Sequence, residues 1–279
     1  MQGRIALVTG ATGGIGTEIA RGLVARGADV IITARDARRG ERVRAELAAA
    51  GSGPVEVLPL DVADQGSIRA LARTVSERTP RLDVLVNNAG AWYTDKKQSP
   101  DGIELTLATN VLGPHLLTAL LMDRLIASPH ARVVNIGSTV AGNLDLTDLQ
   151  FTRRPYDGYK AYGQSKQALA MLTWGLAQRL EQTSVCVNVA SPGFVRTGFN
   201  RNAKGFQATM INMSARLFAT SPAKGADCPL WVATASELDG VTGRWYEGRK
   251  QREAKFSAPG PIAELQRQCD ELTGVSASP

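Results

Sequence analysis

The sequence predicts an α/β protein built on a doubly wound parallel sheet of about seven strands, with helices on both faces. Three observations support this prediction. Short runs of β-branched and apolar residues alternate with stretches of helical periodicity through most of the chain. The first apolar run ends in a glycine-rich turn that opens a helix. No Pro- or Ser-rich linker and no internal repeat interrupts the 279 residues, so we expect a single domain over 1–279.

Apolar runs predict the strands of this sheet, and caps or periodic patterns predict the helices between them. Asp36 and Asp64 stand where the side chain of a helix N-cap is expected, and Ser221 followed by Pro222 opens a later helix. The expected strands are 4–9, 29–34, 55–60, 82–87, 132–136 and 184–189. The expected helices include 15–26 after the first strand and a long one over 162–181.

Composition and charge exclude several classes of protein. With 43% hydrophobic and 21% charged residues, the chain has the apolar content of a packed core rather than of a disordered protein. No apolar run approaches the roughly 18 residues that cross a bilayer. We also find no leader-like segment, so we expect a cytoplasmic protein with no membrane partner. The formal charge of +6 is mild and its clearest basic cluster is local, so no nucleic-acid partner is expected.

Cysteine and histidine are too sparse to predict a metal site or a disulfide framework. Cys186, Cys228 and Cys269 are far apart and lack a C-x-x-C spacing, which fits a reducing compartment. His115 and His130 are the only histidines, and neither has a histidine partner four residues away. We therefore expect no metal, and a histidine-dependent triad only if one of these two residues serves in it.

A glycine-rich turn, TGATGGIG over 9–16, joins the first strand to the first helix. Glycine permits a positive φ and a close approach of the backbone to a ligand, and the start of the helix offers N–H groups to a phosphate. A tight turn alone would also need glycine, but the position within a βαβ unit favours dinucleotide binding by a Rossmann-type fold. The residues expected to contact the dinucleotide here are Gly10, Thr12, Gly13, Gly14, Ile15 and Gly16.

The end of the second strand indicates which dinucleotide is bound. A site for NAD usually places an acidic residue there, whereas this chain has Ala34 followed by Arg35. A guanidinium can hold a 2′-phosphate through charge-assisted hydrogen bonds, so we expect NADP(H) to be preferred over NAD(H). Arg38 and Arg39 could add positive field, or these arginines could simply cover a solvated helix face.

Further residues follow the next strands at the edge of the sheet where open α/β folds bind ligands. They are Asp61 and Val62 after the third strand, Asn88, Ala89 and Gly90 after the fourth, and Ser138 after the fifth. The Asp61 carboxylate could accept a hydrogen bond from an adenine amino group or could cap a turn, and its position favours neither. Asn110 lies in a helical stretch between the fourth and fifth strands.

Two tyrosines have a lysine four residues later, and only one pair is expected on a helix. Tyr156, with Lys160, lies beside Pro155, which predicts a loop. Tyr162 and Lys166 open the long helix, where residues i and i+4 share a face. A nearby ammonium lowers the pKa of a phenol from about 10, which would make Tyr162 a usable acid near neutral pH. Such a pair is often ordinary helix surface, but here Ser138, Asn110 and the glycine turn are expected to converge on it.

Together these motifs resemble the short-chain dehydrogenase/reductase family, in its compact single-domain branch, from about residue 4 to 250. They are TGATGGIG, Asp61-Val62, NNAG at 87–90, Asn110, Ser138, Tyr162 with Lys166, and Pro192-Gly193 after the sixth strand. Within the family the chain is most similar to the retinol-dehydrogenase and WW-domain-oxidoreductase-like group. That similarity rests on ARD at 34–36, DGIELT at 101–106, TNVLGPH at 109–115, AYGQSK at 161–166 and PGFVRT at 192–197.

The resemblance implies an NADP-dependent oxidoreductase that transfers hydride between the nicotinamide and an alcohol or carbonyl group. It implies that Tyr162 is the general acid or base and that Ser138 binds the substrate oxygen. It implies that Lys166 lowers the tyrosine pKa and that Asn110 holds a water linking this lysine to solvent. Tyr162 and Lys166 would also contact the cofactor. The segment expected to contact the nicotinamide comprises Pro192, Gly193, Val195 and Thr197.

The substrate is expected to be a lipophilic or aromatic ketone or aldehyde. The wide spacing between Ser138 and Tyr162 implies an inserted loop near the substrate, and the expected lining segments are 91–99, 142–159 and 199–217. They offer Trp92, Tyr93, Phe151, Phe199, Phe206, Met210 and Met213. The same side chains could instead close the core or an oligomer contact. The reductive direction follows from the expected preference for NADP.

Two other functions fit parts of the pattern. The glycine turn also matches the T-G-x-x-G-x-x-G pattern of the extended epimerase/dehydratase branch, although NNAG is not typical of that branch. A non-catalytic NADP-sensing regulatory protein would share the fold, but it would be expected to lose the Tyr162 and Lys166 pair. The resemblance also implies a homodimer or homotetramer, formed through the helices near 104–126 and 162–181.

Overall fold

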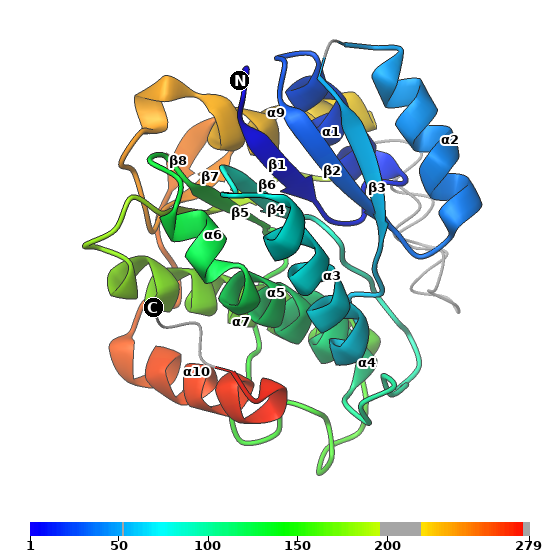
Figure 1. Cartoon of the computed structure of the whole chain (residues 1–279). Coiled ribbons are helices and arrows are strands. Elements are labelled where there is room, and N and C mark those ends of the chain that lie inside the picture. The colour runs from blue at the N-terminus through cyan, green and yellow to red at the C-terminus, as the bar shows by residue number, and fades with distance from the viewer. Residues whose placement is uncertain (52, 196–218, 276–279) are drawn as a thin grey trace.

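The computed structural model describes residues 1–51, 53–195 and 219–275, which form one eight-stranded sheet between two layers of helices (Figure 1). The strand order is β3-β2-β1-β4-β5-β6-β7-β8, and neighbouring strands are parallel except for the last pair, which is antiparallel. The strands are β1 (Ile5–Val8), β2 (Asp29–Ala34), β3 (Val55–Pro59), β4 (Val84–Asn87), β5 (Arg132–Ile136), β6 (Cys186–Ser191), β7 (Trp245–Glu247) and β8 (Lys250–Arg252).

The predicted doubly wound sheet is confirmed, with one strand more than expected. The six expected ranges include neither β7 nor β8, and the residues of β8, Lys250, Gln251 and Arg252, are all exposed. A polar edge strand of this kind has no apolar run that would reveal it in the sequence. The order of strands reverses between β1 and β4, and open α/β folds bind their ligands beyond the carboxyl ends of the strands at such a point.

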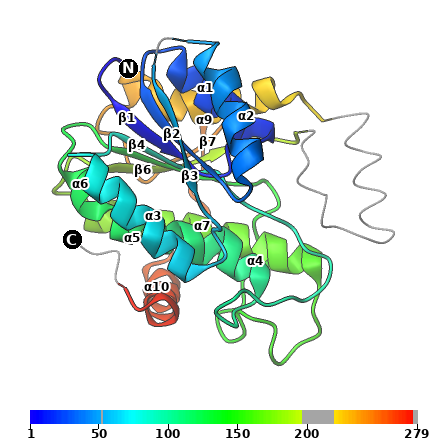
Figure 2. The same ribbon diagram turned by 45° about the vertical axis from the view of Figure 1, so that its right-hand side comes forward.

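Helices cover both faces of the sheet (Figure 2). On one side lie α1, α2 and α9, and on the other lie α3, α5 and α7. The described helices are α1 (Gly14–Val24), α2 (Ala37–Ala48), α3 (Gln65–Arg78), α4 (Leu105–Leu107), the π-helical turn η1 (Ala108–Leu112), α5 (Gly113–Leu120), α6 (Met122–Ile126), α7 (Gly158–Arg179), α9 (Pro222–Thr234), the short 3-10 turn η3 (Ser236–Leu238) and α10 (Pro259–Thr273). None of them combines the length and apolar composition that a bilayer span requires.

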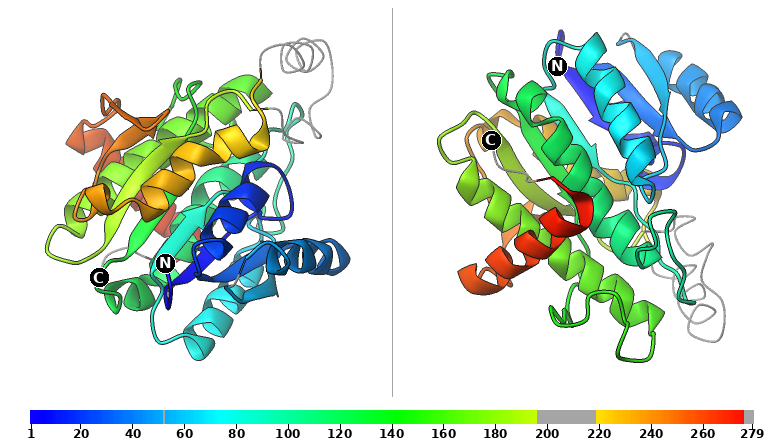
Figure 3. Two further views of the ribbon diagram at one scale, coloured as in Figure 1. Left: turned by 90° about the horizontal axis from the view of Figure 1, so that it is seen from above. Right: turned by 60° about the horizontal axis from the view of Figure 1, so that its bottom comes forward.

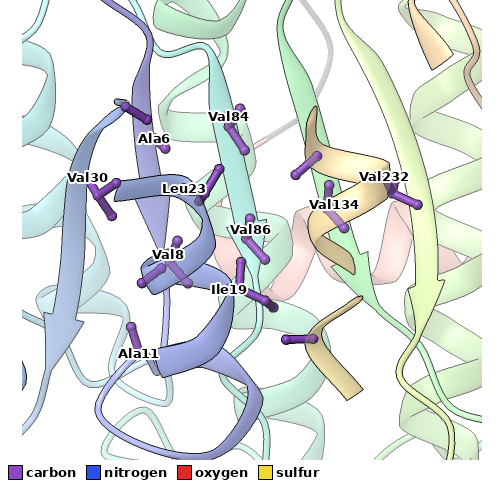
Figure 4. Packing of buried hydrophobic residues seen from close by; sticks show 14 of the residues in the cluster. Ala6, Val8, Ala11, Ile19, Leu23, Val30, Val84, Val86, Val134 and Val232 are labelled. Carbon is purple, nitrogen blue, oxygen red and sulfur yellow. The ribbon is translucent and has the colours of Figure 1, made fainter. Parts of the chain in front are cut away.

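Alternating side chains of the strands build the core on both faces. On β1, Ala6 and Val8 point toward α1 and α9, whereas Leu7 points toward α3 and α5. Figure 4 shows the first of these clusters, in which Ile19 and Leu23 of α1 lie over the central strands. Burying each such aliphatic side chain contributes about 1.5–3 kcal/mol. The sheet is therefore a rigid base for the residues at its edge.

Local signals placed several element boundaries correctly. β2 and β5 match the expected ranges, and Asp36 and Asp64 each accept an N-capping hydrogen bond, from the backbone N–H groups of Arg39 and Ser67. Ser221 caps α9 in the same way. The other boundaries shift by a few residues. In particular, α7 begins at Gly158 rather than 162, because the Asp157 carboxylate accepts hydrogen bonds from the N–H groups of Tyr159 and Lys160.

The C-terminal helix α10 lies across α7 and η1 on the outside of the helix layer (Figure 3, right). Gly175 of α7 makes room for it, since a Cβ there would lie 2.8 Å from a methyl carbon of Ile262. On α5, His115 Nε2 lies 2.9 Å from Asp270 Oδ1 of α10. The helix therefore covers part of the surface through which the family resemblance implies self-association, and the homodimer or homotetramer stays a prediction.

Candidate active site

The backbone of the glycine turn between β1 and α1 packs so closely against the segment after β4 that Gly10 and Gly16 have no space for a side chain. Gly10 and Gly14 have positive φ values of 65° and 60°. A Cβ on Gly10 would lie 2.9 Å from Ala89 Cα, and one on Gly16 would lie 2.4 Å from Asn88 Nδ2. Gly13 has no side chain to cap the first N–H groups of α1, so these donors face the turn. Such a turn fits the pyrophosphate of a dinucleotide.

Asn88 and Thr9 hold this turn against the end of β4. Asn88 Nδ2 donates to the backbone oxygens of Thr9 at 2.8 Å and of Gly10 at 3.2 Å. In return, Thr9 Oγ1 accepts from the N–H groups of Asn88 and Ala89, both at 3.0 Å. The structure thus brings the two segments together as expected. It also adds Thr9, which the sequence indicated only as the residue before the first glycine.

Two arginines lie near the turn, and they differ in how firmly they are held. Arg35 is exposed at the end of β2. Arg39, in the first turn of α2, donates from Nε to the Thr12 carbonyl oxygen at 2.8 Å. Its Nη2 lies against Gly13, where a Cβ would approach it to 2.7 Å. Arg39 therefore lies on the glycine turn rather than on the solvated helix face, whereas Arg38 remains exposed.

Asp61 has the turn-capping role that was one of its two expected roles. Its Oδ1 accepts from the N–H of Ala63 at 3.0 Å, while its own N–H donates to Ser67 Oγ. A contact with an adenine amino group stays a prediction. Val62 follows it, and its carbonyl oxygen lies 2.4 Å from where a Cβ of Gly113 would be, so α5 begins tightly packed against this segment.

Ser138, Tyr162 and Lys166 meet beyond the carboxyl end of β5. The Tyr162 hydroxyl shares a side-chain hydrogen bond with Ser138. Lys166 is buried one turn further along α7, with Nζ 5.8 Å from the centre of the Tyr162 ring. The same ammonium donates to the Ile136 carbonyl oxygen at 2.8 Å. The helix spacing thus brings the phenol and the amine to one side of α7, as the i, i+4 relation predicts.

The protonation of this pair differs from the expectation. Burial raises the pKa of Tyr162 to about 12, although the hydrogen bond with Ser138 opposes that increase. Burial also lowers the pKa of Lys166 to about 8. We expected the ammonium to lower the pKa of the phenol. Burial is the largest influence on both groups, because desolvation disfavours the charged form of each. The phenol is therefore neutral near pH 7 and holds the proton that an acid would deliver.

Asn110, in the π-helical turn η1, is buried and bound to the backbone of the segment after NNAG. Its Oδ1 accepts from the Ala91 N–H at 2.8 Å, and its Nδ2 donates to the Ala91 carbonyl oxygen at 2.9 Å. A Cβ on Gly90 would lie 3.2 Å from Asn110 Oδ1 and 3.7 Å from Lys166 Nζ. Gly90 therefore lies next to both side chains, and the water that the family resemblance implies at Asn110 stays a prediction.

The second Tyr-x-x-x-Lys pair is structural. Tyr156 lies before α7, and its hydroxyl is 3.1 Å from both Glu104 Oε1 and Thr106 Oγ1. Burial and the nearby Glu104 carboxylate raise the pKa of Tyr156 far above its usual range. The hydroxyl also donates to the Tyr93 carbonyl oxygen at 3.2 Å, which ties two of the expected substrate segments together.

The inserted loop between β5 and α7 is organised around the buried carboxylate of Asp148. This carboxylate accepts hydrogen bonds from the N–H groups of Thr152, Arg153 and Arg154 and from the Thr152 hydroxyl. These bonds outweigh the effect of burial and lower the pKa of Asp148 to about 2. Phe151 of the same loop is buried against Tyr156, with ring centres 5.2 Å apart. The loop is thus held in one conformation by its own buried groups, and its place as a wall of the substrate site stays a prediction.

The remaining expected site residues follow β6. Pro192 and Gly193 lie directly after this strand, and Gly193 has a φ of 71°. Val195 packs near Gly225, where a Cβ would lie 2.5 Å from a Val195 methyl carbon. Thr197 lies outside the described residues, as do Phe199, Phe206, Met210 and Met213 of the expected segment 199–217.

Several functional candidates were not evident from the sequence. The sequence indicates Arg39 only as a possible source of positive charge near the cofactor, and it presents Asp148 as one acidic residue of the inserted loop. Ser165 could have been found from its position, because it directly precedes Lys166 within AYGQSK. Over the ranges that the structure describes, no three His, Cys, Asp or Glu side chains are grouped so as to hold a metal ion.

Comparison with known proteins agrees with this geometry. Residues 4–207 match the family model of the short chain dehydrogenases. Retinol dehydrogenase 13 of Mus musculus is 36% identical over 284 residues, covering 99% of this chain and 84% of that protein. Polyprenol dehydrogenase of Mus musculus is 39% identical over 278 residues, covering 95% and 81%.

A solved structure leads to the same family. The Pseudomonas aeruginosa RhlG/NADP active-site complex is 32% identical with a TM-score of 0.71, and the match covers 89% of this chain and 95% of that one. The chain therefore belongs to the short-chain dehydrogenase/reductase family, in its retinol-dehydrogenase-like group, and it is an oxidoreductase that acts on an alcohol or carbonyl group with a nicotinamide cofactor.

Proposed function

We propose that the protein is an NADPH-preferring reductase of lipophilic or aromatic aldehydes and ketones. The observation that carries this proposal is the position of Tyr162. Its hydroxyl is hydrogen-bonded to Ser138, with the Lys166 ammonium on the same side of α7. These are the groups needed to bind a carbonyl oxygen and to deliver a proton to it.

Ser138, Tyr162 and Lys166 would each have a different role in the reaction, which follows from the chemistry of its side chain. When bound, the reduced nicotinamide supplies a hydride to the carbonyl carbon. Ser138 donates a hydrogen bond to the carbonyl oxygen and orients it toward Tyr162. As the carbon accepts hydride, the oxygen gains negative charge and takes the proton of the Tyr162 hydroxyl, so that an alcohol is released. The tyrosinate left behind is stabilised by Lys166, whose ammonium is held close by its bond to Ile136.

The preference for NADPH rests on the two arginines beside the glycine turn. Arg35 occupies the place where NAD enzymes offer an acidic residue. Arg39 is bound to Thr12 and lies over Gly13, close to the phosphate-binding donors of α1. A 2′-phosphate between these two guanidinium groups would be held by charge-assisted hydrogen bonds. The RhlG/NADP complex is consistent with this choice.

The substrate class rests on the relatives and on the walls of the site. The names of two relatives indicate a retinol and a polyprenol as substrates, both lipophilic alcohols. Trp92, Tyr93 and Phe151 are buried in the loops around the site, and Phe194 after β6 is 47% exposed. We also propose a cytoplasmic location, because Cys186, Cys228 and Cys269 are all unpaired thiols, as a reducing compartment would keep them.

Two tyrosine variants test the proposal. Tyr162→Phe should lower kcat for NADPH-dependent carbonyl reduction by at least about a hundredfold, because it removes the proton donor. It should leave the Kd of NADPH nearly unchanged. Tyr156→Phe removes a hydroxyl at the same spacing from a lysine, and it should keep kcat while lowering the melting temperature. Substantial activity in Tyr162→Phe, or NADPH binding without turnover across a wide panel of aldehydes and ketones, would overturn the proposal.

A further inference from the structure

Ser165 of α7 is 1% exposed, and its hydroxyl lies between the backbone of Tyr162 and the side chain of Asn110. Its hydroxyl donates to the backbone carbonyl oxygen of Tyr162 at 2.7 Å. The hydroxyl oxygen of Ser165 in turn accepts a hydrogen bond from Asn110 Nδ2 at 2.9 Å. Ser165 therefore connects the catalytic helix to the π-helical turn η1.

The hydrogen-bonding capacities of these groups permit a single arrangement. A carbonyl oxygen only accepts, so the one hydrogen of the Ser165 hydroxyl must point to Tyr162. The hydroxyl can then only accept from Asn110, which must present its amide nitrogen there. The other two bonds of this amide agree, because Nδ2 meets the carbonyl oxygen of Ala91 and Oδ1 meets the N–H of Ala91. Both hydrogens of the amide are thus used.

These groups connect the glycine turn to the proposed proton donor. Asn88, whose side chain donates to the glycine turn, is joined to Ala91 through the backbone of residues 89 and 90. Hydrogen bonds through Asn110 and Ser165 then connect Ala91 to the backbone of Tyr162. A displacement of about 1 Å between reacting groups can cost about a hundredfold in rate. This series of bonds would therefore hold the glycine turn, where the dinucleotide is proposed to bind, at a set distance from the Tyr162 hydroxyl, the proposed proton donor.

We propose that Ser165 is a positioning residue of this enzyme, which acts through Asn110 and the Tyr162 backbone to align the proton donor with the cofactor side of the site. The proposal rests on the function proposed above. It adds a residue that touches neither substrate nor cofactor and whose loss should affect the chemical step more than binding.

The same helix contains a matched control. Thr173 is 0% exposed and has the same kind of partners as Ser165. Its hydroxyl donates to the Leu169 carbonyl oxygen at 2.8 Å and accepts from Asn135 Nδ2 at 2.9 Å. Ser165→Ala and Thr173→Val each remove one hydroxyl that joins a buried asparagine to the backbone of α7. Only the first of these bridges ends at Tyr162.

Steady-state kinetics of the full chain with NADPH distinguish positioning from stability. Ser165→Ala should lower kcat by about 3- to 10-fold, the effect of one lost hydrogen bond, with KM and the Kd of NADPH nearly unchanged. Thr173→Val should keep kcat while losing a similar amount of stability to urea. If Ser165 acts through Asn110, Ser165→Ala should add little to the loss in Asn110→Ala. Wild-type kcat in Ser165→Ala, equal losses in both hydroxyl variants, or additive losses would overturn the assignment.

Hydrogen exchange of the Ala91 amide tests the same series of hydrogen bonds without measuring turnover. The Ala91 amide should exchange faster in Ser165→Ala than in the wild-type protein, because Asn110 is no longer held from its other side, and it should be unchanged in Thr173→Val. An unchanged Ala91 amide in Ser165→Ala would overturn the positioning role, even in a protein that binds NADPH. Failure of the wild-type protein to reduce any carbonyl would instead overturn the proposed function, and the exchange measurement would still decide the role of Ser165.

Discussion

Lys166 donates a hydrogen bond from its buried ammonium to the backbone carbonyl oxygen of Ile136, 2.8 Å away at the end of β5. The acceptor is a sheet carbonyl rather than an acidic side chain, so the bond fixes the position of the amine without neutralising its charge. Because burial lowers the pKa of Lys166 to about 8, the charge that stabilises the tyrosinate is itself sensitive to pH in a range that assays reach.

The rate of carbonyl reduction should therefore fall as the pH rises above about 8. Lys166 loses its proton there, while Tyr162, with a pKa of about 12, remains protonated. At saturating NADPH, kcat at pH 9 should be about a tenth of its value at pH 7, as one titrating group predicts. Return to pH 7 should restore activity, which excludes unfolding. A flat profile up to pH 10 would contradict the role of the ammonium.

Removal of Arg39 should weaken the preference for NADPH. Arg39→Met removes a guanidinium that is held at Thr12, and the ratio of kcat/KM for NADPH over NADH should fall by about 10- to 150-fold. Arg42→Met, on the exposed side of the same helix, is the control and should leave the ratio unchanged. Ala34→Asp combined with Arg35→Ser should abolish the preference. If both Arg39→Met and this double variant keep it, the site of 2′-phosphate recognition lies elsewhere.

A methyl group at Gly16 should damage the dinucleotide site directly. The added Cβ would lie 2.4 Å from Asn88 Nδ2 and 2.6 Å from the Gly10 carbonyl oxygen, so the turn must move. We expect Gly16→Ala to raise the Kd of NADPH by at least about tenfold and to lower the melting temperature. Gly260→Ala is the control, since a Cβ at this position of α10 meets no atom within 4 Å. Fluorescence titration with NADPH would measure both, and wild-type affinity in Gly16→Ala would contradict the role of this turn in dinucleotide binding.

Asp148→Asn should loosen the loop beside the substrate. An amide nitrogen would face the N–H groups of Thr152, Arg153 and Arg154, and leaving such donors without an acceptor costs about 1–3 kcal/mol. We expect a higher KM for the carbonyl substrate and a lower free energy of unfolding, while the Kd of NADPH stays the same. Asp145→Asn, at a more exposed position of the loop, should have smaller effects. An unchanged KM would show that the loop does not bound the substrate.

The stabilisation by Asp148 also has a defined pH dependence. Its pKa is depressed in the folded protein to about 2 from the ordinary value of 3.8. Its contribution is therefore complete above the ordinary value and is lost as the pH falls through about 2. Acid unfolding of the wild-type protein and of Asp148→Asn should converge in that range, and curves that stay apart below it would contradict the assignment.

Patterns within short segments predicted much of this protein. β2 and β5 were placed correctly because each contains a short run of β-branched apolar residues, VII in β2 and VV in β5, and the caps at Asp36 and Asp64 depend on residues three positions apart. The glycine turn could be predicted because its glycines are close together in the sequence. The Tyr162 and Lys166 pair could be predicted because helix geometry places residues i and i+4 on one face. β8 was missed because an exposed edge strand buries nothing.

By itself, the sequence predicted the parallel sheet, the glycine turn after β1 and the Tyr162 and Lys166 pair on one side of α7, since each depends on neighbours along the chain. Only the tertiary structure decided that Arg39 lies on the turn, that α10 covers α7, and that Ser165 joins Asn110 to Tyr162. It also decided that burial raises the pKa of Tyr162, although the hydrogen bond with Ser138 opposes this shift. Distances between residues far apart in the chain and their exclusion from water set these properties, and both arise only when the elements pack.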